Sequence, residues 1–351
     1  MASRAAASAA LAATAVFGYL SIVRLSQQNG LSAILEAVDL DNDSTLQITG
    51  LDPLDAFLKI LFRFFTPCVA RELPSLSLFA AFAAVQVLPI HTIFVLEGLR
   101  SANASTIFAF PAVWGIIYQC VPFGIIVPIY CATHIWISPL ANFSSTLTAA
   151  NRAEMVSMAP LQVRAVTGAL ILGYILPTVL AALPAPDIVS LHTQQLLLAA
   201  WQTFPAQVVA WQIILVAVVE NIGLVHGSAS ATPRARIQYS KRILPYILGI
   251  TGVLNLAIAG VGVTPLLLSG SANCTLREAF IPVSVSAPQT IASLARGVLS
   301  LLQYDIYCAC GAILIWIYYL SFASSGPFAA LETTAKWGVR SLIVGPGRAA
   351  L

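Results

Sequence analysis

Three carboxylates interrupt long apolar runs of this sequence: Glu97, Glu220 and Asp305. An apolar environment disfavours the ionised form of a carboxylic acid, so such a group can hold a proton at neutral pH. A general acid requires this property. These three residues are therefore the first candidates for proton chemistry.

The stretch around Glu97 carries a polar line. At 100° per residue, Gln86, Ile93, Glu97 and Arg100 fall within about 60° of one another on a helix, and Asn103 follows closely. Lipid would penalise this line, so we expect it to face the protein interior. The stretch predicts a carboxylate, a guanidinium and an amide together at the membrane edge.

The second candidate acid is followed by aromatic residues. On a helix expected to begin at Asp305, one face brings Trp316 and Tyr319 into line beneath the carboxylate. Aromatic faces stabilise cations without acting as nucleophiles. A proton donor beside such rings suits carbocation chemistry on an apolar substrate. Other rings available for the same wall are Trp114, Tyr118, Trp136, Trp201, Trp211 and Tyr304.

Each of these features also has an interpretation without catalysis. Glu97 and Arg100 fit a surface ion pair at spacing i,i+3, and Asp305 fits an acid favoured by a helix N-terminus. Glu220 with Asn221 fits an interhelical polar contact better than a proton site. His91 and His134 fit packing or an interfacial position better than metal binding, because no second His or carboxylate stands at a metal-ligand spacing.

Composition identifies a membrane protein. Hydrophobic residues make up 58% of the chain and charged residues 9%, whereas soluble domains carry about a quarter charged residues. The apolar residues form separate blocks of about 20, which indicates helices. The sequence has no dense basic patch with interleaved aromatics, so nucleic acid is not an expected partner. The six cysteines show no metal-ligand spacing.

The apolar blocks predict an all-α polytopic bundle of about seven spans. The third block contains three prolines, which predict kinks around a cavity. The first block equally resembles a signal peptide. The expected spans cover residues 5–23, 76–96, 107–137, 165–183, 196–225, 243–268 and 305–322.

We divide the chain into three parts. Residues 1–74 hold the first span, a polar segment and an amphipathic helix over 54–71 that is expected to lie in the interface plane. Residues 75–325 form the bundle with the active cavity, and residues 326–351 form a cytosolic or interfacial tail. The acidic residues over 39–43 are interpreted as a solvated loop, because the calcium-loop Gly and Glu are missing.

The basic loop over 228–242 sets the expected orientation. If this loop is cytosolic, seven spans place most of the 17 cations on the same side, as the positive-inside rule requires. Glu97 and Asp305 then both lie at the lumenal ends of their spans, so we expect them to share a site. Glu220 lies toward the other end.

Several catalytic motifs do not occur. There is no Asp-rich motif for Mg²⁺ and a diphosphate, and no Gly-x-Ser-x-Gly, His-Glu-x-x-His, phosphate-binding loop or dinucleotide fingerprint. The missing Asp-rich motif disfavours an ionisation-type terpene synthase. A reaction that begins with protonation needs none of these motifs.

Two short stretches carry a resemblance to a known family: Ile90-His91 with Phe94 through Glu97-Gly-Leu-Arg100 to Asn103, and Gln303-Tyr304-Asp305. In these stretches the chain resembles the integral-membrane terpene cyclases of fungal meroterpenoid and indole-diterpenoid pathways. The resemblance implies a small bundle that protonates an epoxide or olefin of a prenyl chain, without metal or other cofactor. It implies Glu97 and Asp305 as the acid pair, oriented by Arg100 and Asn103.

The leading hypothesis is thus a cyclase of the endoplasmic reticulum membrane, acting on a hydrophobic prenylated substrate that an upstream epoxidase supplies. Glu97, Asp305 and Arg100 are the predicted catalytic residues. The predicted substrate contacts are Asn103, His91, Trp316, Tyr319, Trp114, Tyr118 and Tyr304. Two alternative functions also fit this sequence: a small-molecule transporter or binder that uses the same acids, and a non-catalytic scaffold for pathway enzymes.

Overall fold

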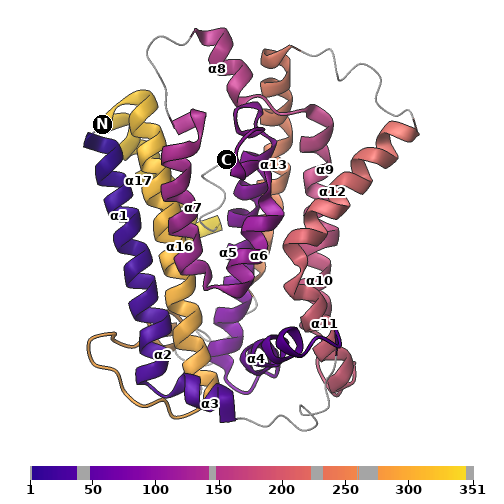
Figure 1. Cartoon of the computed structure of the whole chain (residues 1–351), viewed down its shortest axis with the longest axis vertical. Helices are drawn as coiled ribbons and strands as arrows, with labels where there is room; N and C mark the ends of the chain where they lie inside the picture. Colours follow the sequence, from indigo (N-terminus) through magenta and orange to yellow (C-terminus); the bar gives the residue numbers. More distant parts are fainter. Residues whose placement is uncertain are drawn as a thin grey trace.

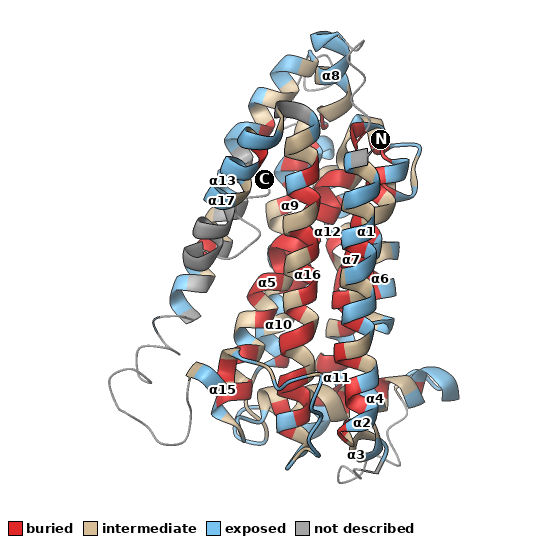
Figure 2. Ribbon diagram, turned by 90° about the vertical axis from the view of Figure 1, so that its left-hand side faces the viewer, coloured by how far each residue is buried: buried red, intermediate tan, exposed pale blue. Residues whose placement is uncertain are grey.

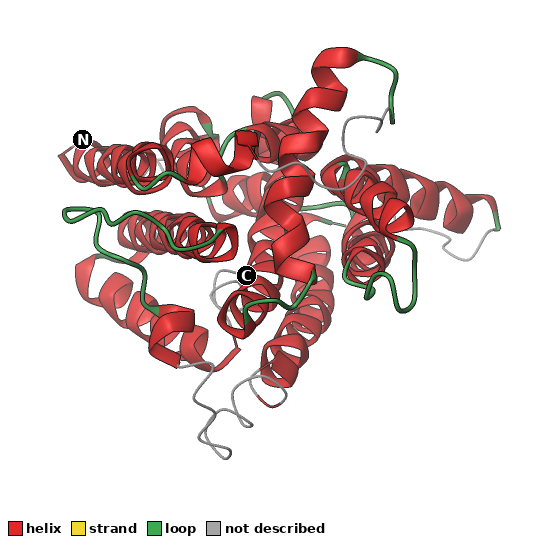
Figure 3. Ribbon diagram, turned by 90° about the horizontal axis from the view of Figure 1, so that it is seen from below, coloured by secondary structure: helices red, strands yellow, loops and turns green. Residues whose placement is uncertain are grey.

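The structure, a computed structural model, describes residues 2–37, 48–141, 148–222, 232–258, 260 and 276–344. These residues form helices joined by short connections, and none of them is in a strand (Figure 1, Figure 3). The all-α prediction is confirmed for this part of the chain. The acidic residues 39–43 lie outside the described residues, as do positions 228–231 of the basic loop.

The helices in the first half of the chain are α1 (Ala2–Gly18), η1 (Tyr19–Arg24), α2 (Leu25–Gln28), α3 (Leu31–Ala37), α4 (Asp52–Val69), α5 (Pro74–Leu99), η3 (Ser101–Asn103), η4 (Ile107–Ala109), α6 (Pro111–Cys120), α7 (Phe123–Ile137) and η5 (Pro139–Ala141). Those in the second half are α8 (Ala149–Val156), α9 (Pro160–Leu170), η6 (Ile171–Ile175), α10 (Leu176–Ala181), α11 (Leu191–Gln202), α12 (Phe204–Asn221), α13 (Pro233–Ile258), α15 (Leu276–Phe280), α16 (Leu294–Ser325) and α17 (Pro327–Val344).

Five helices of the described residues are long and apolar enough to cross a membrane. They cover residues 3–28, 74–99, 149–181, 204–221 and 294–323. The prediction of a helical membrane bundle is therefore supported, but the predicted seven spans are not confirmed. The last of these helices begins at Leu294, where the Ser293 hydroxyl accepts a hydrogen bond from the Arg296 amide. Asp305 thus lies well inside α16 rather than at the start of a span.

Helices α5 and α16 form the centre of the bundle and run parallel. α5 is apolar on all sides and mostly buried, as expected for a core helix, whereas α8 is largely exposed (Figure 2). Phe79, near the start of α5, packs edge-on against Tyr307 of α16 at a centroid distance of 5.7 Å. At the other end, Glu97 of α5 is linked through His134 to Trp316 of α16.

The predicted third span is instead a helical hairpin. Val121 is extended and Pro122 follows it, so α6 ends before α7 begins. α6 starts beside the end of α5, where a Cβ added to Gly98 would lie 3.2 Å from Pro111. α7 ends there too, because the Ser138 hydroxyl donates to the Asn103 side chain over 2.7 Å. Because α6 starts and α7 ends at the same end of the bundle, the pair does not cross it.

This hairpin changes the expected orientation of the helices that come after it in the chain. With one crossing fewer, the segments after α7 lie at the opposite end from the one predicted. Helix α13, which carries the basic residues 234–242, begins at the end of the molecule where α8 lies (Figure 1). α8 also contacts η3, next to Glu97. The basic segment and Glu97 therefore share one end, which corrects the prediction that they face opposite sides.

The predicted amphipathic helix is present as α4, with bounds two residues from those expected. It lies with α11 at the end of the molecule opposite α8 (Figure 1). Asp55 fixes its start by accepting hydrogen bonds from the Thr49 amide and hydroxyl and from the Gly50 amide. These donors stabilise the carboxylate, so the pKa of Asp55 is lowered, chiefly by the Thr49 backbone amide.

Candidate active site

A cavity of about 580 Å³ lies at the α4 end of the bundle. Its walls come from α4, α5, α10, α11 and α16, and the tip of the α6–α7 hairpin reaches into its lining. Most of the lining is aliphatic or aromatic. Among the described residues that line it, Asp305 is the one carboxylate and Arg71 the one basic side chain.

Asp305 is held on one side and left open on the other. Its Oδ1 accepts a hydrogen bond of 2.7 Å from the Gly124 backbone amide, in the first turn of α7. Its Oδ2 has no hydrogen-bond partner among the described residues, and the residue belongs to the cavity lining. The carboxyl group is thus fixed in place with one oxygen available to a molecule in the cavity.

A glycine is needed at position 124. A Cβ there would lie 2.7 Å from the Asp305 carbonyl oxygen and 2.9 Å from Cys308 Cβ, closer than real Cβ contacts. On the opposite side, a Cβ at Gly18 of α1 would lie 2.8 Å from the Gly124 carbonyl oxygen. The start of α7 therefore fits closely between α1 and α16, which lets its amide reach the Asp305 carboxylate.

Aromatic side chains form much of the remaining lining. Tyr118 packs edge-on against Phe123 at a centroid distance of 4.9 Å, and Trp201 packs against Phe65 at 5.2 Å and against Phe204 at 5.5 Å. All five line the cavity. They come from α4, the α6–α7 hairpin, α11 and α12.

Tyr118 has a histidine behind it. Its hydroxyl oxygen lies 2.8 Å from His91 Nδ1, and both side chains are buried. His91 itself does not line the cavity. His91 and Tyr118, two of the predicted substrate contacts, are therefore brought together, with Tyr118 next to the cavity and His91 one layer deeper.

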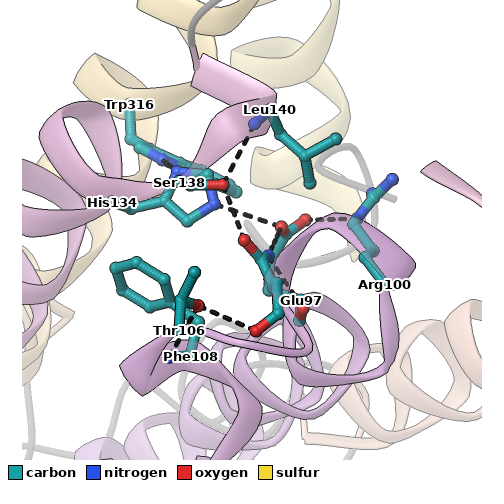
Figure 4. A network of polar contacts seen from close by, with 9 residues as sticks. Glu97, Arg100, Thr106, Phe108, His134, Ser138, Leu140 and Trp316 are labelled. Atoms are coloured by element: carbon teal, nitrogen blue, oxygen red, sulfur yellow. Dashed lines mark hydrogen bonds and ion pairs between the residues drawn. The ribbon is translucent and has the colours of Figure 1, made fainter. Parts of the chain in front are cut away.

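Glu97 lies in a different environment, an enclosed polar network at the α8 end (Figure 4). Its Oε1 accepts from Arg100 Nε at 2.7 Å. Its Oε2 accepts from Asn103 Nδ2 at 3.1 Å and pairs with His134 Nε2 at 3.2 Å. Trp316 Nε1, which can only donate, donates to His134 Nδ1 over 3.1 Å, so the proton of a neutral His134 is on Nε2 and points at Glu97.

The two predicted acids do not share a site. Trp316, which contacts the Glu97 network, lies eleven residues after Asp305 on the same helix, roughly 16 Å along its axis. Glu97 does not line the cavity. The expectation that Glu97 and Asp305 meet at one depth is wrong, because it treated 107–137 as a full crossing and placed Asp305 at a helix start.

The two sites are nevertheless connected by α7. This helix contacts α16 at Gly124 with Asp305 and again at His134 with Trp316. The two contacts are ten residues apart on α7 and eleven apart on α16, or about 15 and 16 Å. The matching separations hold the two helices in a fixed register.

Several predicted aromatic contacts lie away from the cavity. Trp316 and Tyr319 belong to the Glu97 end, where the Tyr319 hydroxyl donates to the Ala141 carbonyl. Trp114 stacks with Phe108, and the Tyr304 hydroxyl donates to the Val283 carbonyl. None of the four predicted residues lines the cavity. Of the predicted wall, Tyr118 and Trp201 are cavity residues.

The third carboxylate and its neighbour also lie elsewhere. Glu220 and Asn221 are exposed at the end of α12, and the Asn221 side chain donates to the Ala217 carbonyl of its own helix. Neither residue lines the cavity. Glu220 and Asn221 therefore do not contribute to the cavity that contains Asp305.

Sequence reasoning missed the parts of the site that are supplied by the hairpin and by α4. Gly124 was not singled out, although the sequence Pro122-Phe-Gly124 breaks the third apolar block. His134 was interpreted as packing, yet it joins Glu97 to Trp316. The phenylalanines of α4 were assigned to the membrane interface, yet Phe57, Phe64 and Phe65 line the cavity.

Comparison with known proteins gives a consistent family match. The CtvD domain family matches residues 6–351. The terpene cyclase ascI of Acremonium egyptiacum is 28% identical over 97% of this chain and 87% of that protein. The terpene cyclases penA of Penicillium crustosum and ctvD of Aspergillus terreus are 26% and 25% identical, covering 93% and 86% of this chain and 89% and 82% of their own lengths. No solved structure matches.

Proposed function

The chain belongs to the CtvD domain family, and on that premise we propose that it is a terpene cyclase that folds an apolar prenyl chain into rings inside the cavity beneath the α6–α7 hairpin. Its similarity to named fungal terpene cyclases supports the reaction class. The apolar, partly aromatic lining around the Asp305 carboxylate supports the location.

Asp305 is the proposed proton donor. Its proton passes from Oδ2 to the oxygen of a terminal epoxide, the carbon–oxygen bond breaks, and a carbocation and a hydroxyl group form. The electrons of the neighbouring double bonds then close the rings in turn. The Gly124 amide on Oδ1 remains bonded throughout and stabilises the carboxylate that proton donation leaves. An olefin in place of the epoxide would be protonated at carbon by the same group.

The aromatic lining stabilises the cation as it moves. The face of an aromatic ring attracts a cation by about 0.5–2 kcal/mol, more when water is absent. Phe65, Phe123, Trp201 and Phe204 supply such rings from four different helices. Rings of this kind hold positive charge without forming a bond to it, so the cation survives until the last ring closes.

Glu97 and Arg100 support the reaction from a distance. Three N–H donors occupy the Glu97 carboxylate, so it has no free oxygen with which to hold a transferable proton. Through His134 and Trp316 the network attaches the upper end of α7 to α16. Glu97 and Arg100 therefore keep Gly124 aligned with Asp305, rather than contacting the substrate.

The proposed reaction also indicates its cellular setting. An epoxide does not arise without an oxygenase, so an epoxidase that acts on the same prenyl chain must precede this enzyme. A substrate of this polarity partitions into lipid, which suits a cavity surrounded by membrane helices. These properties support a membrane location, and we propose the endoplasmic reticulum membrane as that location.

The observation that carries the proposal is the open carboxylate of Asp305 in a large apolar cavity. The test uses detergent-solubilised full-length protein and a phenol that carries a terminally epoxidised farnesyl chain. We expect the wild-type protein to convert this compound to cyclic isomers of the same mass. A transporter or binder would retain the compound unchanged in detergent, and unchanged compound would refute the proposal.

A further inference from the structure

We propose that Tyr118 and His91 end the cyclisation by removing the last proton: the Tyr118 hydroxyl oxygen accepts it from the substrate cation while His91 Nδ1 takes up the hydroxyl proton. The inference rests on the proposed function. A cyclisation that a proton starts leaves a cation, which must lose a proton or capture a nucleophile. The geometry around Tyr118 points to the first outcome.

The hydroxyl groups of the cavity lining differ in where their protons can go. Thr178 donates to the Tyr174 carbonyl, a group that does not hold a proton. Ser77 has no hydrogen-bond partner in the described part of the chain. Tyr118 is directed at an imidazole nitrogen 2.8 Å away, and an imidazole nitrogen that carries a lone pair can accept a proton. Among the described hydroxyls that line the cavity, Tyr118 therefore has a base behind it.

The surroundings of His91 keep it available for this step. Its ring packs edge-on against Phe204 at a centroid distance of 5.2 Å, and Nε2 has no hydrogen-bond partner within the described ranges. We assign the proton of the neutral imidazole to Nε2, so that Nδ1 accepts from the Tyr118 hydroxyl. Nothing among the described residues then competes with Tyr118 for Nδ1.

The step balances without a further reactant. A C–H bond next to the cationic carbon breaks, and its electron pair forms the product double bond. The released proton binds Tyr118, whose original proton moves to His91 Nδ1 and makes an imidazolium. After the product leaves, the imidazolium returns its proton through Tyr118 to water entering the cavity, and Asp305 takes up a proton from the same water. Tyr118 is the catalytic residue, and His91 positions its hydroxyl and accepts its proton.

The test compares product mixtures rather than rates alone. Full-length Tyr118→Phe and His91→Gln are given the epoxyfarnesyl phenol in detergent, and alkene products are separated from water-capture alcohols. We expect epoxide consumption to persist, because Asp305 is intact, while the share of the wild-type alkene falls by about ten-fold in favour of alcohols and isomeric alkenes. Tyr174→Phe is the matched control, because Tyr174 does not line the cavity and its hydroxyl donates to a backbone carbonyl, that of Ala84, rather than to an imidazole.

The outcomes separate the two proposals. A wild-type product ratio in Tyr118→Phe would overturn the inference and leave the cyclase proposal in place. If Tyr118→Phe does not fold, His91→Gln decides in the same way, since it leaves the tyrosine in position. A purely structural role predicts less of the same product in either variant, and this too would overturn the inference. A wild-type protein that converts no epoxide would refute the cyclase proposal itself.

Discussion

Glu97 and Asp305 are both carboxylates within membrane helices, yet their surroundings differ in a way that supports a different proposed role for each. Glu97 is enclosed by Arg100, Asn103 and His134, and lines no part of the cavity. Asp305 has one backbone donor and faces a large apolar space. An acid that transfers a proton needs an open oxygen and room for a substrate, and Asp305 has both.

The Glu97 network and the cavity are linked through α7. α7 is fixed to α16 at two points, one in each region. Replacing a group in the network is therefore expected to move the hairpin tip, and its effect on catalysis is indirect. The following substitutions test this distinction, in order of decreasing expected effect.

Asp305→Asn should have the largest effect on turnover. The amide keeps an oxygen for the Gly124 N–H but cannot donate an acidic proton, so we expect kcat to fall by about 10²–10⁴-fold. The measurement is single-turnover conversion of the epoxyfarnesyl phenol, normalised to folded protein. Thermal unfolding of the variant should stay close to that of the wild type. Retention of wild-type kcat would remove Asp305 from the mechanism.

Gly124→Ala should follow, with a loss in kcat of about 10²-fold or less. The added methyl meets the Asp305 carbonyl oxygen and Cys308, so α7 and α16 must separate and the amide loses its alignment. Gly311→Ala on α16 is the matched control, because a Cβ there meets nothing within 4 Å. Equal kcat values for the two variants would contradict the anchoring role.

Glu97→Gln should affect stability more than chemistry. Replacing the buried Glu97 carboxylate leaves the partly exposed Arg100 without its partner and costs about 1–3 kcal/mol. We expect a lower thermal midpoint and a kcat per folded molecule that falls far less than in Asp305→Asn. Arg100→Gln should behave in the same way. A kcat loss in Glu97→Gln as large as that of Asp305→Asn, at normal stability, would place Glu97 in the reaction.

Asp55→Asn should have the smallest effect, a modest loss of stability at neutral pH that disappears at acidic pH. The folded-state pKa of Asp55 is lowered below its ordinary value of 3.8, so its stabilising contribution is present above that value and is lost as pH falls through the folded-state pKa. Thermal unfolding of the wild type should therefore weaken on acidification below about pH 4. The variant should lose this part of the acid dependence. An identical acid profile in both proteins would contradict the assignment.

The sequence predicted the elements that depend on local pattern. The amphipathic helix α4 follows from apolar periodicity, and the all-helical class follows from the apolar blocks. α5 was predicted within a few residues, because every turn of it is apolar. Tyr118 and Trp201 were named as wall residues from their type alone and do line the cavity.

The α6–α7 hairpin could not be predicted from local pattern. Pro122 indicates a break, but whether the chain then continues across or turns back depends on contacts with distant residues. Those contacts join Gly124 to Asp305 and Ser138 to Asn103. Without them the apolar length favoured a full crossing, and that one assumption misplaced the two acids relative to each other.

A structure with a bound substrate mimic would show directly which carboxylate meets the charge that forms on proton transfer. The mimic is a farnesyl phenol whose terminal epoxide is replaced by a protonated amine, which imitates the charge that forms on proton transfer. We predict that its nitrogen lies within about 3.2 Å of Asp305 Oδ2, with the chain against Trp201 and Phe204. A nitrogen bound at Glu97 instead, or a cavity left empty while the mimic binds elsewhere, would contradict the assignment of Asp305 as the proton donor.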